Sequence, residues 1–391
     1  MKIKVLKEMS TIQISNVDKK IKENEFSVKL CNYTDVYYNW GIYSEMISDF
    51  MTATAKKNEV EKFVLQKNDV VITKDSETKN DIGKSAIIID ELKNCVLGYH
   101  CALIRPNNIE LDGSYLNAVL NTEYAKKYFE LNAGGSGQRF YLNIDIIENM
   151  PVPIIPIKKQ KEIGKFFNDI DKKIYFNNKI NDNLSKQAET IILYTLNNTN
   201  ETIQLSQLID FINGYAFESK SYTTNGKYKI ITIKNVQDGM VSSKKSLMLD
   251  KLPSDIDSNC ILQLGDILIS LTGDVGRVGI VNENNLLLNQ RVAKFNVKNE
   301  LYKAWIYFYF KLNSTKQSLE KISGGSNQKN LSPIETLRLF IKFDEKIIDK
   351  YNKNLNSIFL QLLNNQRENI ELYNMRDYLL PLLINGQATI L

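Results

Sequence analysis

An internal repeat constrains the fold of this chain more than any other feature of its sequence. Residues 68–89 (NDVVITKDSETKNDIGKSAIII) and 265–281 (GDILISLTGDVGRVGIV) each place an aspartate before a β-rich run, which a loop with glycine and a cation connects to a second apolar run. The two aspartates lie 197 positions apart, and the glycine pairs at 134–135 and 324–325 lie 190 apart. Such nearly constant offsets indicate a duplication, which predicts two similar domains in place of one core.

Each glycine pair is followed by a long segment with helical periodicity. Apolar residues recur at alternating steps of four and three within residues 163–195 and again within residues 348–383, which is the heptad pattern of a coiled coil. Each apolar stripe needs a partner, and the two segments have similar lengths, so we expect an intramolecular helix pair. Pro381 is expected to interrupt or end the second helix.

The middle of both heptad segments is polar. Asparagines in a coiled-coil seam lower stability, but they fix the register and exclude slipped pairings. The alternative interpretation is a frayed, solvated stretch. The asparagines concerned are Asn177, Asn181, Asn365 and Asn369.

The remaining sequence has the character of β-sheets with peripheral helices. Residues 228–236, 260–271 and 291–297 have strand character, whereas residues 114–132 and 302–322 are predicted helices whose ends the glycine pairs would cap. We therefore expect an α+β fold of two similar β-rich globular domains, separated by a pair of long antiparallel coiled-coil helices and related by a pseudo-twofold axis. The expected boundaries are 1–157 for the first domain, 158–200 for the first spacer helix, 201–340 for the second domain and 341–391 for the second spacer helix.

Composition limits the location and the partners of the chain. The sequence has neither a secretory signal nor a run approaching the ~18 apolar residues of a membrane span, so we expect a cytoplasmic protein without membrane contact. A net charge of +5 does not by itself indicate nucleic-acid binding. Residues 1–157 carry 19 Lys and Arg against 21 Asp and Glu, and residues 205–340 carry 17 against 12, so binding to a polyanion must be local.

The sequence contains no set of residues that predicts catalysis. His100 is the single histidine, which excludes a histidine-based triad or a histidine-rich metal site and favours a structural or DNA-facing role. Residues 81–86 (DIGKSA) lack the first glycine of a phosphate-binding loop, and residues 273–279 (GDVGRVG) lack the start of a dinucleotide fingerprint. We expect no catalytic residue, no cofactor and no metal, and therefore no enzymatic activity of the chain alone.

The order of these features, present twice, resembles the specificity subunit of Type I restriction-modification systems. The resemblance is clearest in residues 213–222 (NGYAFESKSY), 264–281 (LGDILISLTGDVGRVGIV) and 324–331 (GGSNQKNL), with residues 152–184 matching in the first half. It implies two target recognition domains, each binding one half of a bipartite, asymmetric sequence in double-stranded DNA. It also implies that the helices act as a spacer and dock two methyltransferase subunits, and that restriction and translocation subunits complete the complex.

Two departures from the family pattern bear on the placement of the second helix. Asn68 replaces the glycine that usually precedes the aspartate, and the proline-rich exit with Gln160 has no equivalent after Leu339. A strictly symmetric placement of the two helices is therefore left open.

Candidate DNA-binding residues follow from the chemistry of base recognition. Arg, Lys, Asn and Gln can bond to base edges, while contacts to phosphates position a domain, and loops beside the repeated features are the natural place for both. The two glutamines after the glycine pairs could instead brace the glycine turns. In the first half the candidates are Asn32, Tyr33, Tyr37, Tyr38, Lys74, Tyr99, Gln138 and Arg139, and in the second half they are Lys220, Lys234, Asn235, Arg277, Gln290, Arg291, Gln328 and Lys329.

Other functions stay open at this point. The chain could be a scaffold that recruits proteins through its coiled coil, the specificity part of a related single-complex methyltransferase and nuclease system, or an enzyme of that kind with a degenerate site. The sequence gives neither the recognised bases and spacer length nor the oligomeric state without partners.

Overall fold

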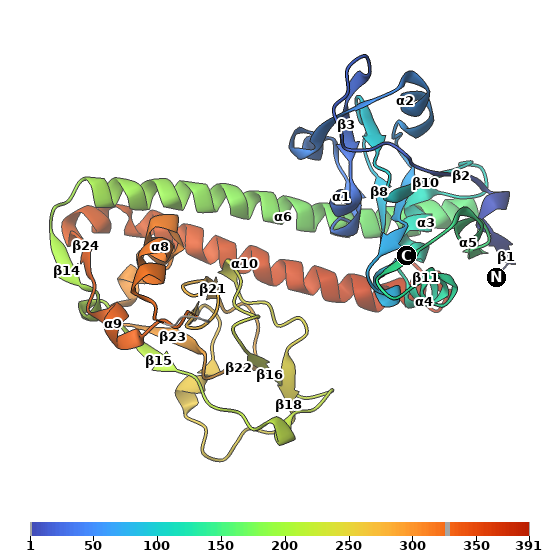
Figure 1. Ribbon diagram of the computed structural model, residues 1–391. Coiled ribbons are helices and arrows are strands. Elements are labelled where there is room, and N and C mark those ends of the chain that lie inside the picture. The colour runs from blue at the N-terminus through green and yellow to red at the C-terminus, as the bar shows by residue number, and fades with distance from the viewer. Residues whose placement is uncertain (1, 325–328, 391) are drawn as a thin grey trace. The chain divides into compact units, whose positions relative to one another are not determined.

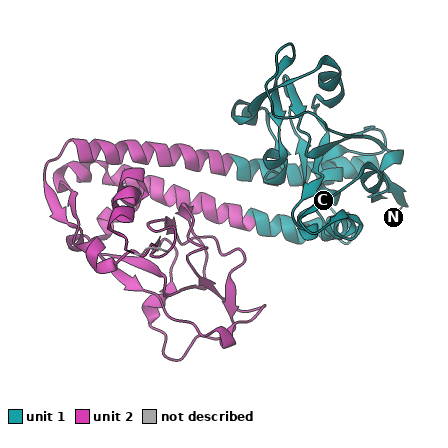
Figure 2. Cartoon of the chain, viewed as in Figure 1, with its two compact units in different colours: residues 1–175, 372–391 teal, residues 176–371 magenta. Residues whose placement is uncertain are grey.

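The structure is a computed structural model that describes residues 2–324 and 329–390 (Figure 1). The chain divides into two compact units, shown in Figure 2: unit 1 comprises residues 1–175 and 372–391, and unit 2 comprises residues 176–371. Two long helices, α6 (Ile157–Asn197) and α10 (Glu345–Ile384), each continue from one unit into the other. Each unit therefore has a globular body and a share of both helices.

The body of unit 1 is built around a five-stranded sheet with the order β2-β10-β6-β8-β4 and a three-stranded sheet with the order β5-β3-β9. The strands of the larger sheet are β2 (Ser10–Ile14), β10 (Cys101–Pro106), β6 (Val70–Thr73), β8 (Ser85–Ile88) and β4 (Gly41–Ile42). Those of the smaller sheet are β5 (Met51–Ala55), β3 (Phe26–Cys31) and β9 (Cys95–Leu97). The central strands β6 and β8 are buried along their whole length, and β-branched residues suit such positions.

Smaller elements complete unit 1. Strand β1 pairs with β13, and a second three-stranded sheet has the order β11-β12-β7. These strands are β1 (Lys2–Val5), β13 (Pro151–Ile154), β11 (Gly134–Ser136), β12 (Arg139–Tyr141) and β7 (Asp75–Ser76). The shorter helices are α1 (Tyr33–Tyr37), α2 (Lys57–Phe63), α3 (Gly113–Leu120), α4 (Glu123–Asn132) and α5 (Ile144–Glu148).

Unit 2 has a five-stranded sheet with the order β15-β23-β20-β21-β17 and a four-stranded sheet with the order β18-β16-β22-β19. The strands of the larger sheet are β15 (Ile209–Asn213), β23 (Val292–Val297), β20 (Ile267–Ser270), β21 (Val278–Ile280) and β17 (Gly239–Met240). Those of the smaller sheet are β18 (Leu247–Leu249), β16 (Tyr228–Ile231), β22 (Leu286–Leu288) and β19 (Ile261–Leu262). Strand β14 (Thr202–Gln204) pairs with β24 (Phe340–Lys342), and the shorter helices are α7 (Lys303–Lys311), α8 (Asn313–Ile322) and α9 (Pro333–Leu337).

The two units share one topology. In both five-stranded sheets the last pair is parallel, β4 with β8 in unit 1 and β17 with β21 in unit 2. Both smaller sheets contain one parallel pair, β3 with β9 and β16 with β22. Matching strand orders and matching parallel pairs confirm the predicted α+β fold with two similar β-rich parts.

The repeated aspartates have a structural role in both units. Asp69 accepts a hydrogen bond from the backbone of Gln66 and pairs with Arg105 at 2.7 Å. Asp266 likewise accepts from the backbone of Gln263, and it lies 3.3 Å from the Lys294 ammonium group. Each carboxylate closes the turn before a central strand and is neutralised by a cation of the neighbouring strand.

Asn68 replaces the glycine of the family pattern, and its backbone conformation explains why an asparagine fits there. Asn68 and its counterpart in the repeat, Gly265, both adopt positive φ angles, 73° and 83°. Asparagine is the residue that, after glycine, most readily enters this left-handed region. The turn before the strand therefore keeps its shape although the residue type differs.

The predicted helices and caps before the glycine pairs were partly wrong. Residues 114–132 form two helices, because Thr122 interrupts the run and caps α4 by accepting a hydrogen bond from the backbone of Ala125. Residues 302–322 likewise form α7 and α8, separated at Leu312. The first glycine pair lies in β11 of a hairpin and not in a helix cap, and the positive φ of Gly135, 103°, suits that position.

Helices α6 and α10 pair in an antiparallel direction within unit 2. The Asn177 side chain donates a hydrogen bond to Asn369 Oδ1 at 2.9 Å, and Asn365 donates to Asn181 Oδ1 at 2.8 Å. Three of these asparagines are at least nine-tenths buried, which excludes the alternative of a frayed, solvated stretch. We call these four residues the asparagine cluster. Direct amide pairs at defined positions favour one register over slipped alternatives.

Apolar residues of both helices are buried on either side of the asparagine cluster. In unit 1, Phe167 and Ile170 of α6 share a core with Leu383 of α10. In unit 2, Ile192 of α6 shares a core with Leu355 of α10. Pro381 does not break α10, which ends three residues later at Ile384.

A carboxylate of α6 binds the body of unit 1. Asp171 accepts a hydrogen bond from the Tyr43 hydroxyl at 2.8 Å, and its carboxylate also bonds to the backbone at Gly41 in β4. Burial raises the pKa of Asp171 to about 6, although the Tyr43 hydrogen bond and the charge of Arg376 work in the opposite direction. Its contribution to stability is therefore present below about pH 4 and is lost as the pH rises through about 6.

Substitution of Asp171 by Asn tests this pH dependence. We expect Asp171→Asn to raise the free energy of unfolding of unit 1 at pH 8 by at most about 3 kcal/mol, and to leave it nearly unchanged at pH 4. The amide oxygen can still accept the hydrogen bond from Tyr43, while the unfavourable buried charge is removed. Urea denaturation at several pH values measures the difference, and a variant with the pH profile of the unchanged chain would contradict the argument.

Candidate nucleic-acid interface

Three basic side chains of unit 1 meet around one carboxylate. The Asp75 Oδ2 atom is 2.8 Å from His100 Nδ1, 2.9 Å from Lys74 Nζ and 3.6 Å from a guanidinium nitrogen of Arg139. We call Lys74, Asp75, His100 and Arg139 the Asp75 cluster. Lys74 and Arg139 were predicted from the sequence, whereas Asp75 and His100 were not among the predicted site residues.

Backbone hydrogen bonds bring the three segments of the Asp75 cluster together. The backbone N–H of Lys74 donates to the His100 carbonyl at 3.0 Å, and the Leu142 N–H donates to the Lys74 carbonyl at 2.8 Å. Strand β12, which begins with Arg139, pairs with β7, which begins with Asp75. The side chains therefore meet because the starts of β7, β10 and β12 lie next to one another.

The electrostatic balance of the Asp75 cluster is positive towards the solvent. Burial alone would raise the pKa of Asp75, but hydrogen bonds from His100 and Lys74 and the charge of Arg139 outweigh it and lower the pKa. The Asp75 side chain is 13% exposed, whereas that of Arg139 is 63% exposed. One inner carboxylate thus holds three basic side chains, of which Arg139 is the most exposed, and a surface of this kind suits a polyanion.

Helix α1 adds an aromatic surface to unit 1. Asn32 caps the helix by accepting a hydrogen bond from the Tyr33 backbone, and the rings of Tyr33 and Tyr37 stack with centroids 5.5 Å apart. The Tyr37 hydroxyl donates to Asp81 at 2.5 Å, and burial is the main cause that raises the pKa of Tyr33 to about 12. Tyr38 is 77% exposed. Asn32, Tyr33 and Tyr37 therefore support the helix, whereas Tyr38 presents an exposed ring.

The two other predicted residues of the first half lie beside the Asp75 cluster. The Tyr99 ring packs on the His100 ring with centroids 3.7 Å apart. Gln138 is exposed in the turn between β11 and β12, next to Arg139. The sequence signal for His100 was therefore its position next to the predicted Tyr99.

Unit 2 has a comparable arrangement around Asp274, in the loop after β20. Its carboxylate is 3.3 Å from the Arg277 guanidinium group and 2.9 Å from Lys316 of α8. Arg277 also donates a hydrogen bond to the backbone carbonyl of Ile233 at 2.9 Å, so its guanidinium group is fixed from two sides. Arg277 was predicted, whereas Asp274 and Lys316 were missed because residues 42 positions apart give no local signal.

The other predicted residues of unit 2 are spread over several loops. Lys220 pairs with Glu218 at 2.7 Å, and Lys329 pairs with Glu320 at 2.9 Å. Lys234, Gln290 and Arg291 are exposed, the latter two between β22 and β23. Gln328 lies outside the described residues. The structure thus brings fewer of the predicted residues together in this unit than in unit 1.

Asn235 has a structural position. Its side chain is 6% exposed, donates to Ser242 and Ser246, and accepts from Thr232. Both the amide nitrogen and the amide oxygen of Asn235 are therefore bonded within one loop. Asn235 therefore braces the loop that presents Lys234 and has no group left for a base.

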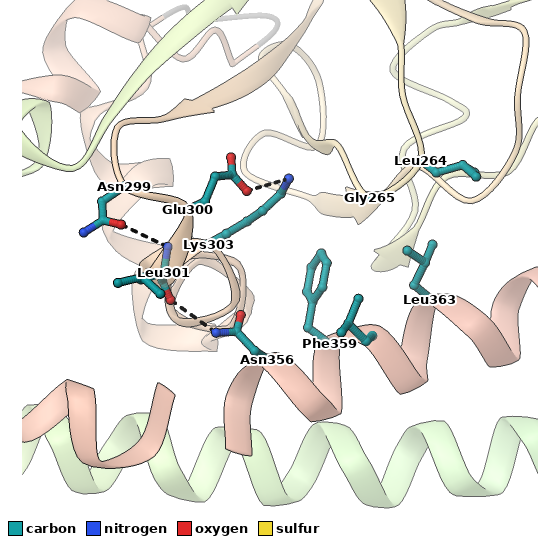
Figure 3. A pocket seen from close by; sticks show the side chains of 10 residues that line it. Leu264, Gly265, Asn299, Glu300, Leu301, Lys303, Asn356, Phe359 and Leu363 are labelled. Carbon is teal, nitrogen blue, oxygen red and sulfur yellow. Dashed lines mark hydrogen bonds and ion pairs between the residues drawn. The ribbon is translucent and has the colours of Figure 1, made fainter. Parts of the chain in front are cut away.

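Unit 2 also has an apolar groove of about 420 Å³ along α10 (Figure 3). Phe359, Leu360 and Leu363 of α10 form one wall, and Leu264 and Leu301 lie opposite. Leu301 and Leu360 are 60% and 57% exposed, so the groove is open to the solvent. Residues of this kind contact other proteins more readily than DNA.

Within residues 2–324 and 329–390, no three His, Cys, Asp or Glu side chains are grouped so that they could hold a metal ion. In the same part of the chain, no helix is both long and apolar enough to cross a membrane.

Comparison with known proteins identifies the family. Residues 1–186 and 197–341 match the family model of the Type I restriction modification DNA specificity domain. The Type I restriction enzyme MjaVIII specificity subunit of Methanocaldococcus jannaschii is 21% identical over 419 residues, which cover 99% of this chain and 95% of that protein. The Type I restriction enzyme EcoAI specificity subunit of Escherichia coli is 31% identical over 169 residues, which cover 38% and 28%.

A solved structure shows the same fold. The crystal structure of the Type I restriction-modification system S subunit from M. genitalium has a TM-score of 0.61 and 13% sequence identity, and covers 98% of this chain and 95% of that one. Together with the family match over both halves, the repeated topology and the long helix pair lead to one assignment. The chain belongs to the Type I restriction-modification specificity subunits, a non-catalytic family with a role in recognising DNA sequence.

Proposed function

We propose that the chain recognises a bipartite, asymmetric DNA sequence, with residues 1–157 binding one half and residues 201–340 the other. One observation supports this proposal above all: the two units share one topology but present different side chains at corresponding loops. Around Asp75 unit 1 presents His100 and Arg139, whereas around Asp274 unit 2 presents Arg277. Similar bodies with different donor sets suit two unlike half-sites.

Direct base contacts are proposed for most of the candidates, and supporting roles for those whose side chains stabilise their own helix or loop. Arginine and lysine bond to guanine, glutamine and asparagine bond to adenine, and tyrosine can bond to phosphates or pack on sugar and base surfaces. Asn32, Tyr33 and Tyr37 would then shape α1, and Asn235 its loop. The proposed contacts are Tyr38, Lys74, Tyr99, Gln138 and Arg139 in the first half, and Lys220, Lys234, Arg277, Gln290, Arg291, Gln328 and Lys329 in the second.

The helix pair, residues 158–200 and 341–391, is proposed as the spacer and as the docking surface for two methyltransferase subunits. Both helices expose large apolar residues, which a docked subunit would bury. Restriction and translocation subunits would complete the complex, and DNA as the target agrees with the cytoplasmic location expected from the sequence. The exposed residues include Ile180, Leu193 and Tyr194 on α6 and Leu360, Met375 and Tyr378 on α10.

Mapping of methylated bases tests the proposed function. The chain is expressed with its methyltransferase subunits in cells without other methylation, and modified sites are mapped with and without the chain. We expect one split motif that depends on the chain. A scaffold without a DNA-recognition function would leave methylation unchanged.

Exchange of one module sharpens this test. Replacing residues 1–157 with the corresponding part of another specificity subunit should change one half of the split motif and leave the other half intact. The reciprocal exchange of residues 201–340 is the matched control and should change the opposite half. A change of both halves by either exchange would contradict independent recognition.

A further inference from the structure

Arg376 is a charged residue in the apolar stripe of α10. The stripe continues through Leu372, Leu379 and Leu383, and Arg376 occupies the position between the first two. Ala188 lies at the same distance from the start of α6 and is fully buried, as an apolar seam requires. The arginine therefore needs a reason that the pairing of the helices does not supply.

Two aromatic rings receive the Arg376 side chain. Its guanidinium carbon lies 5.3 Å from the centroid of the Trp40 ring and 5.1 Å from the centroid of the Tyr373 ring, and a guanidinium nitrogen bonds to the neighbouring Asp377 at 3.1 Å. The Arg376 side chain is 19% exposed, and Trp40 is 7% exposed. A planar guanidinium group packs well on aromatic faces, and the attraction grows as water is excluded. The C-terminal helix is thus bound to a residue near the N-terminus of the chain.

Both long helices hold the segment of unit 1 that begins at Trp40. Trp40 Nε1 donates a hydrogen bond to Asn168 of α6 at 3.3 Å, and the Tyr43 hydroxyl donates to Asp171 of α6 at 2.8 Å. Arg376 of α10 lies over the Trp40 ring, and its charge opposes the rise in the pKa of Asp171 that burial causes. The segment is therefore fixed where α6 and α10 meet the body of unit 1.

The same segment ends the helix that precedes the exposed Tyr38. Asn39, between Tyr38 and Trp40, donates from its side chain to the Asp35 carbonyl at 2.9 Å and so closes the last turn of α1. The Trp40 carbonyl accepts a hydrogen bond from the Ile87 N–H at 2.9 Å, which ties it to the central sheet. A displacement of Trp40 would therefore reach Tyr38 through one intervening residue.

An arginine at this position favours placement over stability. Removing a charge from water costs free energy, and apolar residues in place of buried charges often leave a protein equally stable. Leucine at position 376 would complete the apolar stripe of α10. What it would not supply is a planar cation that packs on the Trp40 ring.

We propose that Arg376 is a positioning residue for DNA recognition by unit 1, which acts through Trp40 and fixes α1 and the exposed Tyr38 ring relative to the two long helices within this unit. The inference rests on the proposed DNA-recognition function. Arg376 does not itself contact DNA in this role. Its loss should therefore reduce discrimination between bases in one half-site and leave the non-specific attraction to phosphates nearly unchanged.

Arg376→Leu, in the full chain with its methyltransferase subunits, is the direct test. We expect discrimination against single-base changes in the half-site proposed for residues 1–157 to fall roughly tenfold, and discrimination in the other half-site to stay the same. Fluorescence anisotropy with labelled duplexes measures both. Quenching of tryptophan fluorescence by acrylamide should increase, because Trp40 loses its cover while Trp305, the second tryptophan, stays buried in unit 2.

Two further variants separate placement from charge and from stability. Arg338→Leu is the matched control, because Arg338 is 66% exposed and the substitution removes the same charge from unit 2. It should leave discrimination in both half-sites unchanged. Arg376→Lys keeps the charge but not the planar group that packs on Trp40, and it should reduce discrimination about threefold. Hydrogen exchange resolved along the chain verifies that unit 1 stays folded.

The outcomes separate the inference from the proposed function. If Arg376→Leu discriminates bases like the unchanged chain, or if Arg338→Leu loses as much, the inference is wrong although the proposed function stands. An equal loss in both half-sites would contradict it as well. If unit 1 unfolds in Arg376→Leu, Arg376→Lys decides in its place by the same criteria. If the unchanged complex does not prefer its mapped target over a scrambled duplex, the proposed function itself fails.

Discussion

Removing seven residues from each long helix should bring the two halves of the DNA target about three base pairs closer together. Seven residues of α-helix are about 10 Å long, and a base pair is about 3.4 Å. The best deletion is residues 176–182 together with residues 364–370, which lie between the residues buried in the two cores. The double deletion removes all four residues of the asparagine cluster together, so no buried amide is left without its partner, and a whole heptad preserves the apolar frame on which the shortened helices can still pair.

The expected change in binding is large. The shortened chain should bind the original target about 1,000-fold more weakly, because one domain then meets bases out of place and only non-specific contacts remain for it. Selection from duplexes with spacers of varied length, in complex with the methyltransferase subunits, should recover a target with a shorter spacer. An unchanged preferred spacing would rule out the helices as the element that sets it.

A deletion in one helix alone is the matched control. Removing residues 176–182 but not 364–370 leaves Asn365 and Asn369 without their partners and shifts one apolar stripe past the other by a heptad. We expect this variant to melt at a lower temperature and to show no single preferred spacing. The comparison separates a shorter spacer from a damaged one.

The sequence predicted those parts of the fold that periodic patterns determine. The offset between Asp69 and Asp266 predicted two units with one topology, because each aspartate fixes the same turn before a central strand. The heptads predicted the helix pair, and Asn177 and Asn365 were assigned to its register for the reason that the structure shows. Such features are local in sequence, so their physical cause can be seen without coordinates.

Features that depend on distant segments were not predictable in the same way. Asp75, between Lys74 and a polar loop, has the sequence context of a solvated charge, and its contact with Arg139 joins residues 64 positions apart. The interruption at Thr122 was missed because threonine occurs inside helices as well as at their N-caps. Residues of a recognition surface are selected by where loops meet, and one sequence does not contain that information.

One difference between the units, in contrast, was visible in the sequence, because Gln160 has no equivalent after Leu339. Its side chain is fully buried, donates to the carbonyls of Glu110 and Ile155, and accepts from the N–H of Asp112. These bonds hold the first turn of α6 against the loop before α3. Unit 2 lacks this glutamine, and further along α10 the residues Phe359, Leu360 and Leu363 line the open groove.

Gly164→Leu should have the largest effect on stability, and it should act on unit 1. A Cβ atom at Gly164 would lie 2.6 Å from Ser114 Cβ and 2.8 Å from the backbone nitrogen of Tyr115, both in α3. Backbone cannot move aside as a flexible side chain can, so α6 would have to leave α3. We expect unit 1 to lose about 3 kcal/mol, as overpacked sites do. Hydrogen exchange resolved along the chain should show faster exchange in unit 1, with unit 2 unchanged.

Lys165→Leu is the matched control, because it introduces the same side chain at the next position of α6. Lys165 is 75% exposed and pairs with Asp169 on its own helix, an interaction worth about 0.3–0.5 kcal/mol. If both variants unfold alike, then close approach at Gly164 does not hold α6 against unit 1. If only Gly164→Leu opens unit 1, the glycine fixes the point at which the body of unit 1 is joined to α6. The variant should then lose recognition of the half-site proposed for residues 1–157 while it keeps the other, because unit 2 has its own contacts with both helices.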